Sequence, residues 1–420
     1  METSTSDITA ASLGDQLLRQ LDSVSPLHDQ FPIALSVSAA GICPWSWLDA
    51  NAGSTRIAWS ERDSDVISAG IGCAADISLP AHGDPADCFR TCRQLLGHNQ
   101  TLRCFGGFSF DGSDGWRSFG AGRFVIPRLI FADDQMTLAV MDADDLDSAR
   151  AAVRELCIPR SSFDDRLPVP IEKSHQPTFD GWQSRIDEAL SLIRAEALEK
   201  IVLSRKTRLR FESAPNPIAL TSHLEKATHD CFVFCFDFGD NSAFLGATPE
   251  RLFLRSENNL RSEVVAGTRM RGTDDAEDER LAIELLTSDK DQREHDIVRK
   301  SIRQKLHKFV EHLQVDNQAS ILRLAKKQHL RSNVFGTLKS GITDDMLLKR
   351  LHPTPAVGGY PTDNALPEIS RIEPFNRGWY AAPIGWIGAT DAQFAVAIRS
   401  GFLAILRQGL THVRFRRQSR

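Results

Sequence analysis

The segment His352-Pro-Thr-Pro-Ala-Val-Gly-Gly-Tyr-Pro361 restricts the backbone of this 420-residue chain more than any other stretch. Proline fixes φ and removes a hydrogen-bond donor, so prolines two residues apart cannot continue a helix or a central strand. The glycine pair lets another part of the molecule approach the backbone closely. We therefore expect a stiff loop here, and flanking segments that build around it a site for a small anion and a hard metal ion.

The composition is that of an ordinary globular protein, with 41% hydrophobic residues, 25% charged residues and a net charge of -5. This charge balance argues against a nucleic-acid partner, because such proteins carry a concentrated basic excess. No run of eighteen apolar residues and no basic, apolar leader occurs, so we predict neither a membrane span nor a secretory signal. The eight cysteines lack zinc-site spacing and are expected to be free thiols in the cytoplasm. We also expect a monomer.

Two kinds of pattern divide the chain. Short extended runs broken by glycine dominate residues 31–140, whereas helical periodicity becomes prominent after residue 180. Prolines at 159, 168, 170 and 177 mark the boundary between them. The predicted parts are a loose lead (1–30), a sheet-rich part (31–170), a catalytic part (171–402) and an atypical C-terminal segment (403–420).

Lys200 and Glu250 are the candidates for proton transfer. Lys200 opens an alternating segment, residues 200–206, which predicts a strand. Its side chain would either extend along the surface to water or, if desolvated, act as a general base with a pKa below the usual value of about 10.4. Glu250 follows Thr248-Pro249 at an expected strand end. Alone it would be solvated, but opposite a basic group it would supply the acid of an acid–base pair.

Glu294 lies near the start of a predicted long helix. Ser288 and Asp291 have capping-box spacing, which places Glu294 in the second turn, near the positive end of the helix dipole. Glu294 would either stabilise that helix or provide a hard oxygen ligand for magnesium. Gly267-Thr268, at an expected strand end, and Arg399 would bind a substrate carboxylate through backbone N–H groups and a two-pronged cation.

Seven segments, taken together and in this order, resemble the chorismate-utilising enzymes and among them the isochorismate synthases. The resemblance covers residues 171–402 densely and implies an α+β fold of large antiparallel β-sheets in a sandwich flanked by helices. The segments are residues 200–205, 246–252, 266–272, 290–295, 352–361, 377–386 and 397–400.

In that family the lysine matching Lys200 activates water to attack C2 of chorismate, and the glutamate matching Glu250 protonates the departing C4 hydroxyl. The resemblance also implies a magnesium ion on Glu294. It implies an isomerase whose product, isochorismate, serves salicylate or dihydroxybenzoate siderophore or menaquinone synthesis. The positions that match the lining of the chorismate pocket are Gly267, Thr268, Ala356, Tyr380 and Arg399.

Anthranilate and aminodeoxychorismate synthases resemble this chain but lack the base lysine, so Lys200 argues for a member that adds water. A salicylate synthase, which keeps the lysine and eliminates pyruvate, is one alternative. A catalytically dead homologue that binds chorismate or a partner enzyme is another.

The last residues depart from the family pattern. Relatives continue after Ser400 through a glycine-rich strand to closely spaced glutamates and a lysine, and one of those glutamates is the second magnesium ligand. Here no acidic residue follows Asp391, and five arginines lie in the final fourteen residues. We therefore expect a truncated C-terminus, weakened magnesium binding and impaired turnover.

Overall fold

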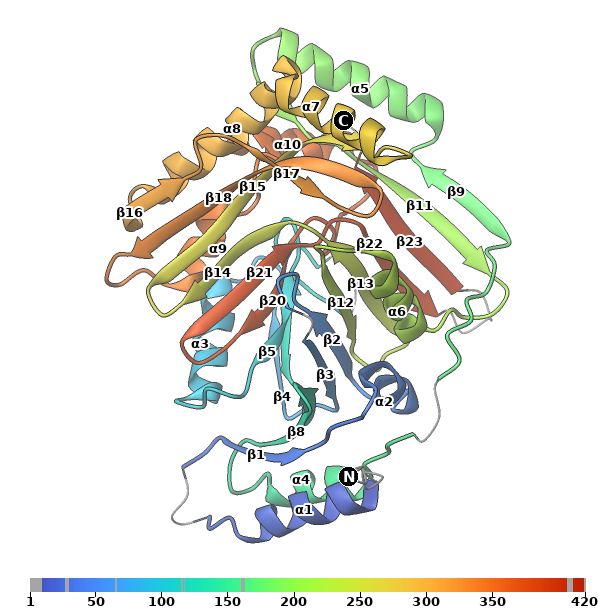
Figure 1. Cartoon of the computed structure of the whole chain (residues 1–420), viewed down its shortest axis with the longest axis vertical. Helices are drawn as coiled ribbons and strands as arrows, with labels where there is room; N and C mark the ends of the chain where they lie inside the picture. The colour runs from blue at the N-terminus through green and yellow to red at the C-terminus, as the bar shows by residue number, and fades with distance from the viewer. Residues whose placement is uncertain are drawn as a thin grey trace.

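Two large antiparallel β-sheets form most of the molecule (Figure 1). The computed structural model describes residues 10–26, 30–64, 66–114, 116, 118–159, 163–405 and 411–418. The first sheet has eleven strands, in the spatial order β1 (Ile33–Ser38), β8 (Gln135–Val140), β7 (Leu129–Ala132), β3 (Ile67–Ile71), β2 (Arg56–Ser60), β12 (Phe232–Asp237), β13 (Ser242–Thr248), β22 (Ser400–Ile405), β23 (Thr411–Gln418), β11 (Ser204–Phe211) and β9 (Glu172–Gln176).

The second sheet has ten strands, and a third, two-stranded sheet lies apart from both. The order in the second sheet is β16 (Val310–Val315), β18 (Lys327–Leu338), β15 (Asn259–Met270), β14 (Arg251–Ser256), β21 (Asp391–Val396), β20 (Pro383–Ile387), β5 (Cys104–Phe108), β6 (Gly122–Ile126) and β4 (Ala75–Leu79), with β17 (Ser320–Arg323) paired to β18. The small sheet pairs β10 (Lys200–Ile201) with β19 (Gly359–Tyr360). Both large sheets take strands from either side of residue 170.

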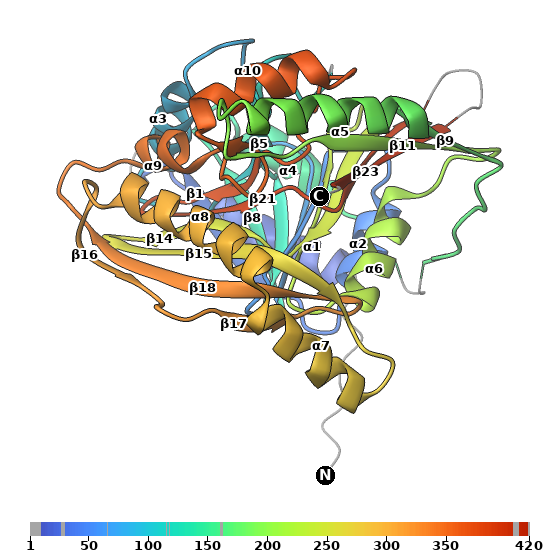
Figure 2. The ribbon, with the colours of Figure 1, turned by 90° about the horizontal axis from the view of Figure 1, so that it is seen from above.

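Helices pack on the sheets and confirm the predicted α+β class. One group buries apolar residues against the outer face of the first sheet: α1 (Ala10–Asp22), α2 (Pro44–Ala50), α4 (Leu146–Arg154) and α6 (Pro217–Ala227). Another group shares its core with the second sheet: α3 (Pro85–Leu96), α8 (Asp289–Leu306) and α9 (Asp344–Leu351). α7 (Asp275–Thr287) contacts β15, and α5 (Phe179–Arg194) packs with α10 (Thr362–Ile372), as Figure 2 shows.

An aromatic core lies between the two large sheets. Along β12, Phe232, Phe234 and Phe236 join this core, whereas Cys235 joins the cluster beneath the helices of the first sheet. This period of two follows from the pleat, which turns successive side chains to opposite faces. From the second sheet, residues such as Phe394 enter the same core. The core therefore holds the two sheets, and the crossovers between them, in fixed relative positions.

The predicted strand over residues 200–206 is interrupted. β10 ends at Ile201, β11 begins at Ser204, and the two strands belong to different sheets. The alternating pattern cannot reveal such a break, because Val202 and Leu203 are buried like strand residues. In the part of the chain that the structure describes, every helix is too short or too polar to cross a membrane. All eight cysteines are free thiols, as expected.

Candidate active site

Glu250 lies where the chain crosses from the first sheet to the second. β13 ends at Thr248 and β14 begins at Arg251, so Pro249 and Glu250 form the crossover. The backbone N–H of Val396 donates to the carbonyl oxygen of Glu250 at 2.9 Å, and the Thr248 hydroxyl donates to the carbonyl oxygen of Val396 at 2.6 Å. The end of β21 thus fixes the backbone that carries the Glu250 side chain.

The Glu250 carboxyl group is buried and has a perturbed pKa. Burial disfavours its charged form and raises its pKa to about 7. The Thr354 hydroxyl donates to Oε1 of Glu250 at 3.2 Å and lowers the pKa. The nearby Glu263 charge raises it, whereas the cations of Lys200 and Arg399 lower it. Near neutral pH the group can therefore exchange a proton, as a general acid must.

Lys200 and Glu294 form an ion pair between β10 and α8. Lys200 Nζ lies 3.2 Å from Glu294 Oε1, and the two side chains are 14% and 18% exposed. β10 is fixed by its pairing with β19, in which Lys200 is opposite Tyr360. Because Lys200 also acts electrostatically on Glu250, the structure brings Lys200, Glu250 and Glu294 into one cluster.

Arg399 and the segment Gly267–Thr268 meet at His329. Arg399 Nη2 donates to His329 Nε2 at 2.6 Å, so that ring nitrogen must be unprotonated. His329 Nδ1 then carries the proton and faces the carbonyl oxygen of Gly267 at 3.1 Å and Thr268 Oγ1 at 2.8 Å. A neutral His329 therefore links three of the five predicted substrate-binding residues, namely Gly267, Thr268 and Arg399. Arg399 also has a left-handed φ of 54°, a strained conformation that clusters at functional sites.

Gly267 lies inside β15 and not at a strand end as expected. β15 continues to Met270, and its pairing with β18 shifts register between Ala266 and Thr268. At this bulge Gly267 has a φ of 76°, and an added Cβ would lie 3.1 Å from Leu330 Cδ1. In the sequence the glycine indicated a strand end, whereas a bulge interrupts the pairing without ending the strand.

Tyr380 and Ala356, which were predicted to line the substrate pocket, pack with the aromatic core. Tyr380 is only 2% exposed and belongs to the core between the sheets, and Ala356 packs against the same core. Next to Tyr380, Ala381 has a φ of 59° and donates its N–H to the carbonyl oxygen of Ala397 at 3.0 Å. Tyr380 is thereby held beside the crossover that carries Arg399.

The proline-rich loop is anchored at its first residues. Lys305 Nζ donates to the carbonyl oxygen of Pro353 at 3.1 Å, and His352 Nε2 donates to that of Phe110 at 3.1 Å. Burial lowers the pKa of Lys305 to about 8 and that of His352 to about 4, so His352 is neutral. The loop therefore presents Thr354 to Glu250 in a fixed position.

A buried ion pair ties this loop to the break between β10 and β11. Arg377 Nη2 lies 2.6 Å from Glu373 Oε1, and each side chain is 3% exposed. Arg377 also donates to the carbonyl oxygens of Val357 at 2.8 Å and Val202 at 2.7 Å. The N–H of Ser204 donates to Glu373 Oε1 at 2.6 Å. The pair thus positions the strand that carries Lys200 relative to the loop that carries Thr354.

Several of these residues escaped the sequence prediction. Thr354 had a signal, since it stands between the two prolines of a stiff loop. Arg377 and Glu373 had only an i, i+4 spacing. Glu263 and His329 had none, because long-range pairing alone brings them near Glu250 and Arg399.

The residues around Glu294 fit magnesium bound by one protein carboxylate. Magnesium takes one or two carboxylates and completes its shell with water and an anionic substrate. Asp291, one turn earlier, is buried, and its Oδ2 lies 2.8 Å from Arg269 Nη2, which neutralises its charge. Within the part of the chain that the structure describes, no group of three or more His, Cys, Asp or Glu side chains could hold a metal ion.

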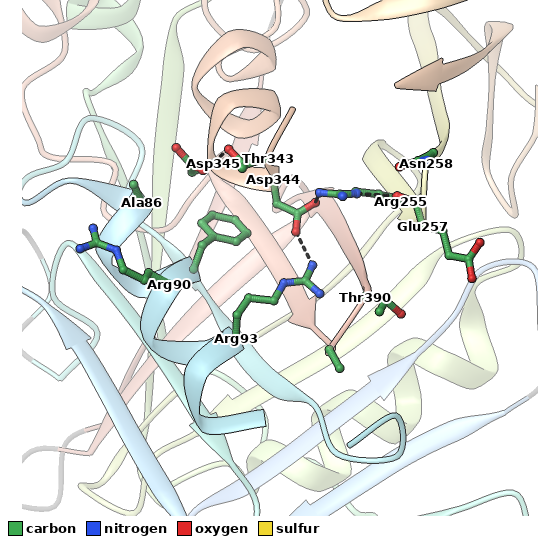
Figure 3. Close-up of a pocket in the computed structure, with 12 residues that line it drawn as sticks. Ala86, Arg90, Arg93, Arg255, Glu257, Asn258, Thr343, Asp344, Asp345 and Thr390 are labelled. Atoms are coloured by element: carbon green, nitrogen blue, oxygen red, sulfur yellow. Dashed lines mark hydrogen bonds and ion pairs between the residues drawn. The ribbon is translucent and has the colours of Figure 1, made fainter. Parts of the chain in front are cut away.

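A cavity of about 560 Å³ lies away from this cluster, among α3, α9 and two strand turns (Figure 3). Asp344 binds Arg93 there, and its Oδ1 accepts from Arg255 Nη1 at 3.2 Å. Asp344 thus bridges the two arginines, and its single negative charge balances one of their two positive charges. None of the predicted site residues lines this cavity, which is bordered by Ala86, Phe89, Arg90, Arg93, Arg255, Glu257, Asn258, Thr343, Asp344, Asp345, Ala389 and Thr390.

The sequence and the fold correspond to a known enzyme family. Residues 20–410 match the family model described as "Chorismate binding enzyme", and the chain belongs to this family. Within the family it is similar to isochorismate synthases. The solved structure of MenF, the menaquinone-specific isochorismate synthase from Escherichia coli, matches with a TM-score of 0.85 at 27% identity, covering 98% of this chain and 94% of that one.

Two relatives extend this likeness. Isochorismate synthase 2, chloroplastic, from Arabidopsis thaliana is 34% identical over 375 residues, which cover 84% of this chain. A salicylate biosynthesis isochorismate synthase from Pseudomonas aeruginosa is 40% identical over 223 residues, which cover 53% of this chain. The matches span 66% of the Arabidopsis protein's length and 46% of the Pseudomonas protein's length.

Proposed function

We propose that this protein is an isochorismate synthase, an isomerase that adds water to C2 of chorismate and removes the C4 hydroxyl. The observation that carries the proposal is the cluster of Lys200, Glu250 and Glu294, because it combines a base, an acid with a pKa of about 7 and a carboxylate that fits a hard cation. The similarity to isochorismate synthases supports the same reaction.

Lys200 acts as the base in the proposed mechanism. Its amine accepts a proton from water while the water oxygen forms a bond to C2. The C1=C2 double bond then becomes C1=C6, and the C5=C6 double bond becomes C4=C5. The C4–O bond breaks with its electron pair leaving on oxygen, and protonated Glu250 gives its proton to that oxygen, which departs as water. One water enters and one leaves, so the product is an isomer of the substrate. To act as a base, Lys200 must be a neutral amine. It must therefore first lose the ammonium proton that gives it the positive charge paired with Glu294.

The substrate's carboxylate groups determine how the ring is placed. We assign one carboxylate to Arg399, whose guanidinium is oriented by His329 and suits a planar, bidentate partner. The carbonyl oxygen of Gly267 and the hydroxyl group of Thr268 contact the same histidine. Ala356 and Tyr380, which pack with the aromatic core, supply the apolar wall for the ring.

Magnesium completes the proposal. Glu294 would hold the ion, which would supply positive charge to a substrate carboxylate. Lys200, paired with Glu294 at 3.2 Å, competes with a cation for the Glu294 carboxylate. Asp291 does not serve as a second ligand in this assignment, because Arg269 already occupies it.

Incubation with chorismate, with and without Mg²⁺, tests the function when the products are identified by chromatography and mass. Isochorismate that forms only with Mg²⁺ supports the proposal. Salicylate together with pyruvate would instead assign a salicylate synthase, and tight chorismate binding without product, unaltered in Lys200→Ala, would assign a dead homologue. The name of the Pseudomonas relative favours a salicylate-producing pathway as consumer of the product, and MenF favours menaquinone synthesis.

A further inference from the structure

Arg62 and Glu263, which are far apart in the sequence, form a buried ion pair. This pair is hydrogen-bonded to the backbone on both sides of Glu250. Arg62 Nη1 and Nη2 lie 2.6 and 2.8 Å from Glu263 Oε1 and Oε2, and the two side chains are 1% and 2% exposed. Arg62 Nη1 also donates to the carbonyl oxygen of Pro249 at 2.5 Å. The N–H of Arg251 donates to Glu263 Oε1 at 2.8 Å. The residues immediately before and after Glu250 are therefore held by one bidentate pair.

The pair also joins the two large sheets at the crossover. Arg62 follows β2 of the first sheet, and Glu263 lies in β15 of the second. The guanidinium of Arg62 is 5.5 Å from the centre of the Phe232 ring, on β12 next to β2. A bidentate arginine–carboxylate pair in such an environment has a defined geometry, which a single hydrogen bond would not impose.

We propose that Arg62 and Glu263 are positioning residues for Glu250, holding its backbone and setting the charge that its carboxyl group experiences. This inference rests on the proposed role of Glu250 as the acid. It assigns a functional reason to a pair that contributes two fully desolvated charges to the core, where an apolar replacement would often be as stable.

The Glu263 charge acts on Glu250 directly, and Arg62 acts on Glu250 through its pairing with Glu263. The Glu263 anion raises the pKa of Glu250 together with burial, whereas the Thr354 hydroxyl and the cations of Lys200 and Arg399 lower it. Arg62 neutralises Glu263 at 2.6 Å. Removing Glu263 would therefore favour the Glu250 carboxylate, and removing Arg62 would disfavour it. A pair that served only to stabilise the fold would not produce opposite shifts.

The experiment compares Glu263→Gln and Arg62→Met in the full chain, with the pH profile of kcat/KM for isochorismate formation as the readout. We expect the alkaline limb, where Glu250 loses its proton, to move to lower pH in Glu263→Gln and to higher pH in Arg62→Met, by about half a pH unit or more. Limbs that move in the same direction, or that stay at the wild-type pH in both variants, would overturn the proposal.

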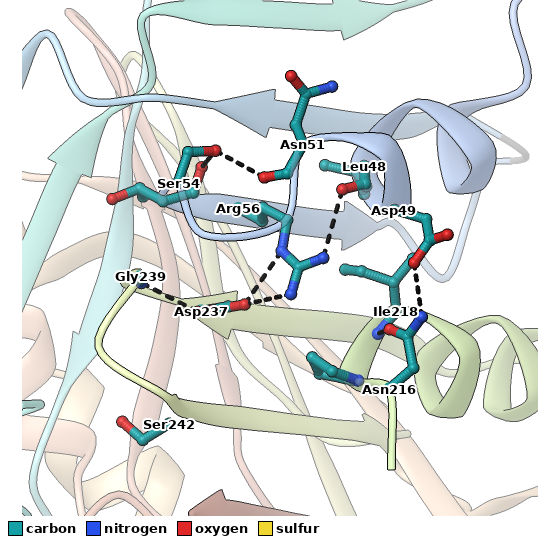
Figure 4. Close-up of polar contacts among 12 residues, drawn as sticks. Leu48, Asp49, Asn51, Ser54, Arg56, Asn216, Ile218, Asp237, Gly239 and Ser242 are labelled. Carbon is teal, nitrogen blue, oxygen red and sulfur yellow. Dashed lines mark hydrogen bonds and ion pairs between the residues drawn. The ribbon is translucent and has the colours of Figure 1, made fainter. Parts of the chain in front are cut away.

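The chain offers a matched control pair (Figure 4). Arg56 Nη2 lies 2.6 Å from Asp237 Oδ2, with side chains 7% and 9% exposed, and Arg56 Nη1 donates to the carbonyl oxygen of Leu48 at 3.4 Å. Arg56 lies at the start of β2, the strand that precedes Arg62. Arg56→Met and Asp237→Asn should lower the melting temperature without moving the alkaline limb. A limb displaced as far as in Glu263→Gln would count against a specific role.

Two further measurements separate the possible failures. If Arg62→Met does not fold, Arg62→Lys keeps the charge but not the bidentate geometry, and it should lower kcat while leaving the limb near its wild-type pH. If the wild type makes no isochorismate, the proposed function fails. The charge effect is then tested by ¹³C NMR titration of labelled glutamate carboxyl groups, with Glu250→Gln to assign the signal. Opposite shifts of the Glu250 titration support the pair's role, and equal shifts reject it.

Discussion

The hydroxyl group of Thr354 donates a 3.2 Å hydrogen bond to Oε1 of Glu250, and both residues are buried. This bond stabilises the ionised carboxylate and opposes the effect of burial, which favours the neutral acid. The proline-rich loop thereby acts on the proton affinity of a residue in a crossover between the two sheets.

Replacing Thr354 by Val should raise the pKa of Glu250 further, because the carboxylate loses a donor and keeps its burial. A hydrogen bond worth about 1 kcal/mol corresponds to somewhat less than one pKa unit. The alkaline limb of kcat/KM should therefore move to higher pH by about half a unit. Thr354→Ser, which keeps the hydroxyl, should retain the wild-type profile. A limb displaced to lower pH in Thr354→Val would contradict the assignment.

Glu250→Gln should abolish turnover and yet stabilise the protein at alkaline pH. The folded-state pKa of Glu250, about 7, lies above its ordinary value of 4.5. The wild type therefore loses stability, by about 3 kcal/mol, as the pH rises through this interval, because the unfolded chain releases the proton first. Glutamine does not ionise and escapes this loss.

Urea unfolding of wild type and Glu250→Gln at pH 5 and pH 8 measures the effect. The difference in unfolding free energy should shift in favour of the variant by a few kcal/mol between the two pH values. An equal difference at both pH values would mean that Glu250 titrates normally in the folded protein.

Local patterns predicted much of the fold. Short extended runs broken by glycine indicated a sheet-rich part over residues 31–140, where β1, β5, β6 and β8 lie. The predicted helix start at Ser288 is confirmed by the Asp291 N–H, which donates to Ser288 Oγ at 3.3 Å. The pairing of β2 with β12, far apart in sequence, could not be predicted, because side-chain alternation says which face is buried and not which strand lies alongside. For the same reason, local patterns could not indicate that both large sheets take strands from either side of residue 170.

The site was predictable only where a residue carries a reactive group within a recognisable motif. Lys200, Glu250 and Glu294 were named from motif resemblance and their acid, base and metal-binding groups, and the structure brings them together. The sequence did not indicate a role for Arg62, because Arg62 contacts Pro249 and Glu263 only once β2 and β15 are brought to the same crossover. Residues that orient a functional group through the backbone have no local pattern of their own.

Lys200→Met should bind Mg²⁺ more tightly than the wild type while losing all isochorismate formation. The ammonium group lies 3.2 Å from Glu294 Oε1 and competes with a cation for that carboxylate. Because both side chains are partly exposed, the pair is worth about 1 kcal/mol, which corresponds to roughly a fivefold change in Kd. Isothermal titration with MgCl₂ measures it, and Glu294→Gln should show no binding. Weaker Mg²⁺ binding by Lys200→Met would place the metal away from Glu294.

The Arg377–Glu373 pair allows stability and positioning to be separated. Arg377→Met leaves Glu373 buried without its partner, which should cost about 3–5 kcal/mol of unfolding free energy. The double variant Arg377→Met/Glu373→Leu removes that unpaired charge and should recover most of the stability. It does not restore the hydrogen bonds from Arg377 to Val202 and Val357, which tie the Lys200 strand to the loop. Thermal melting should therefore return toward wild type while kcat stays at least tenfold reduced, and a double variant that regains full turnover would show that the pair only stabilises the fold.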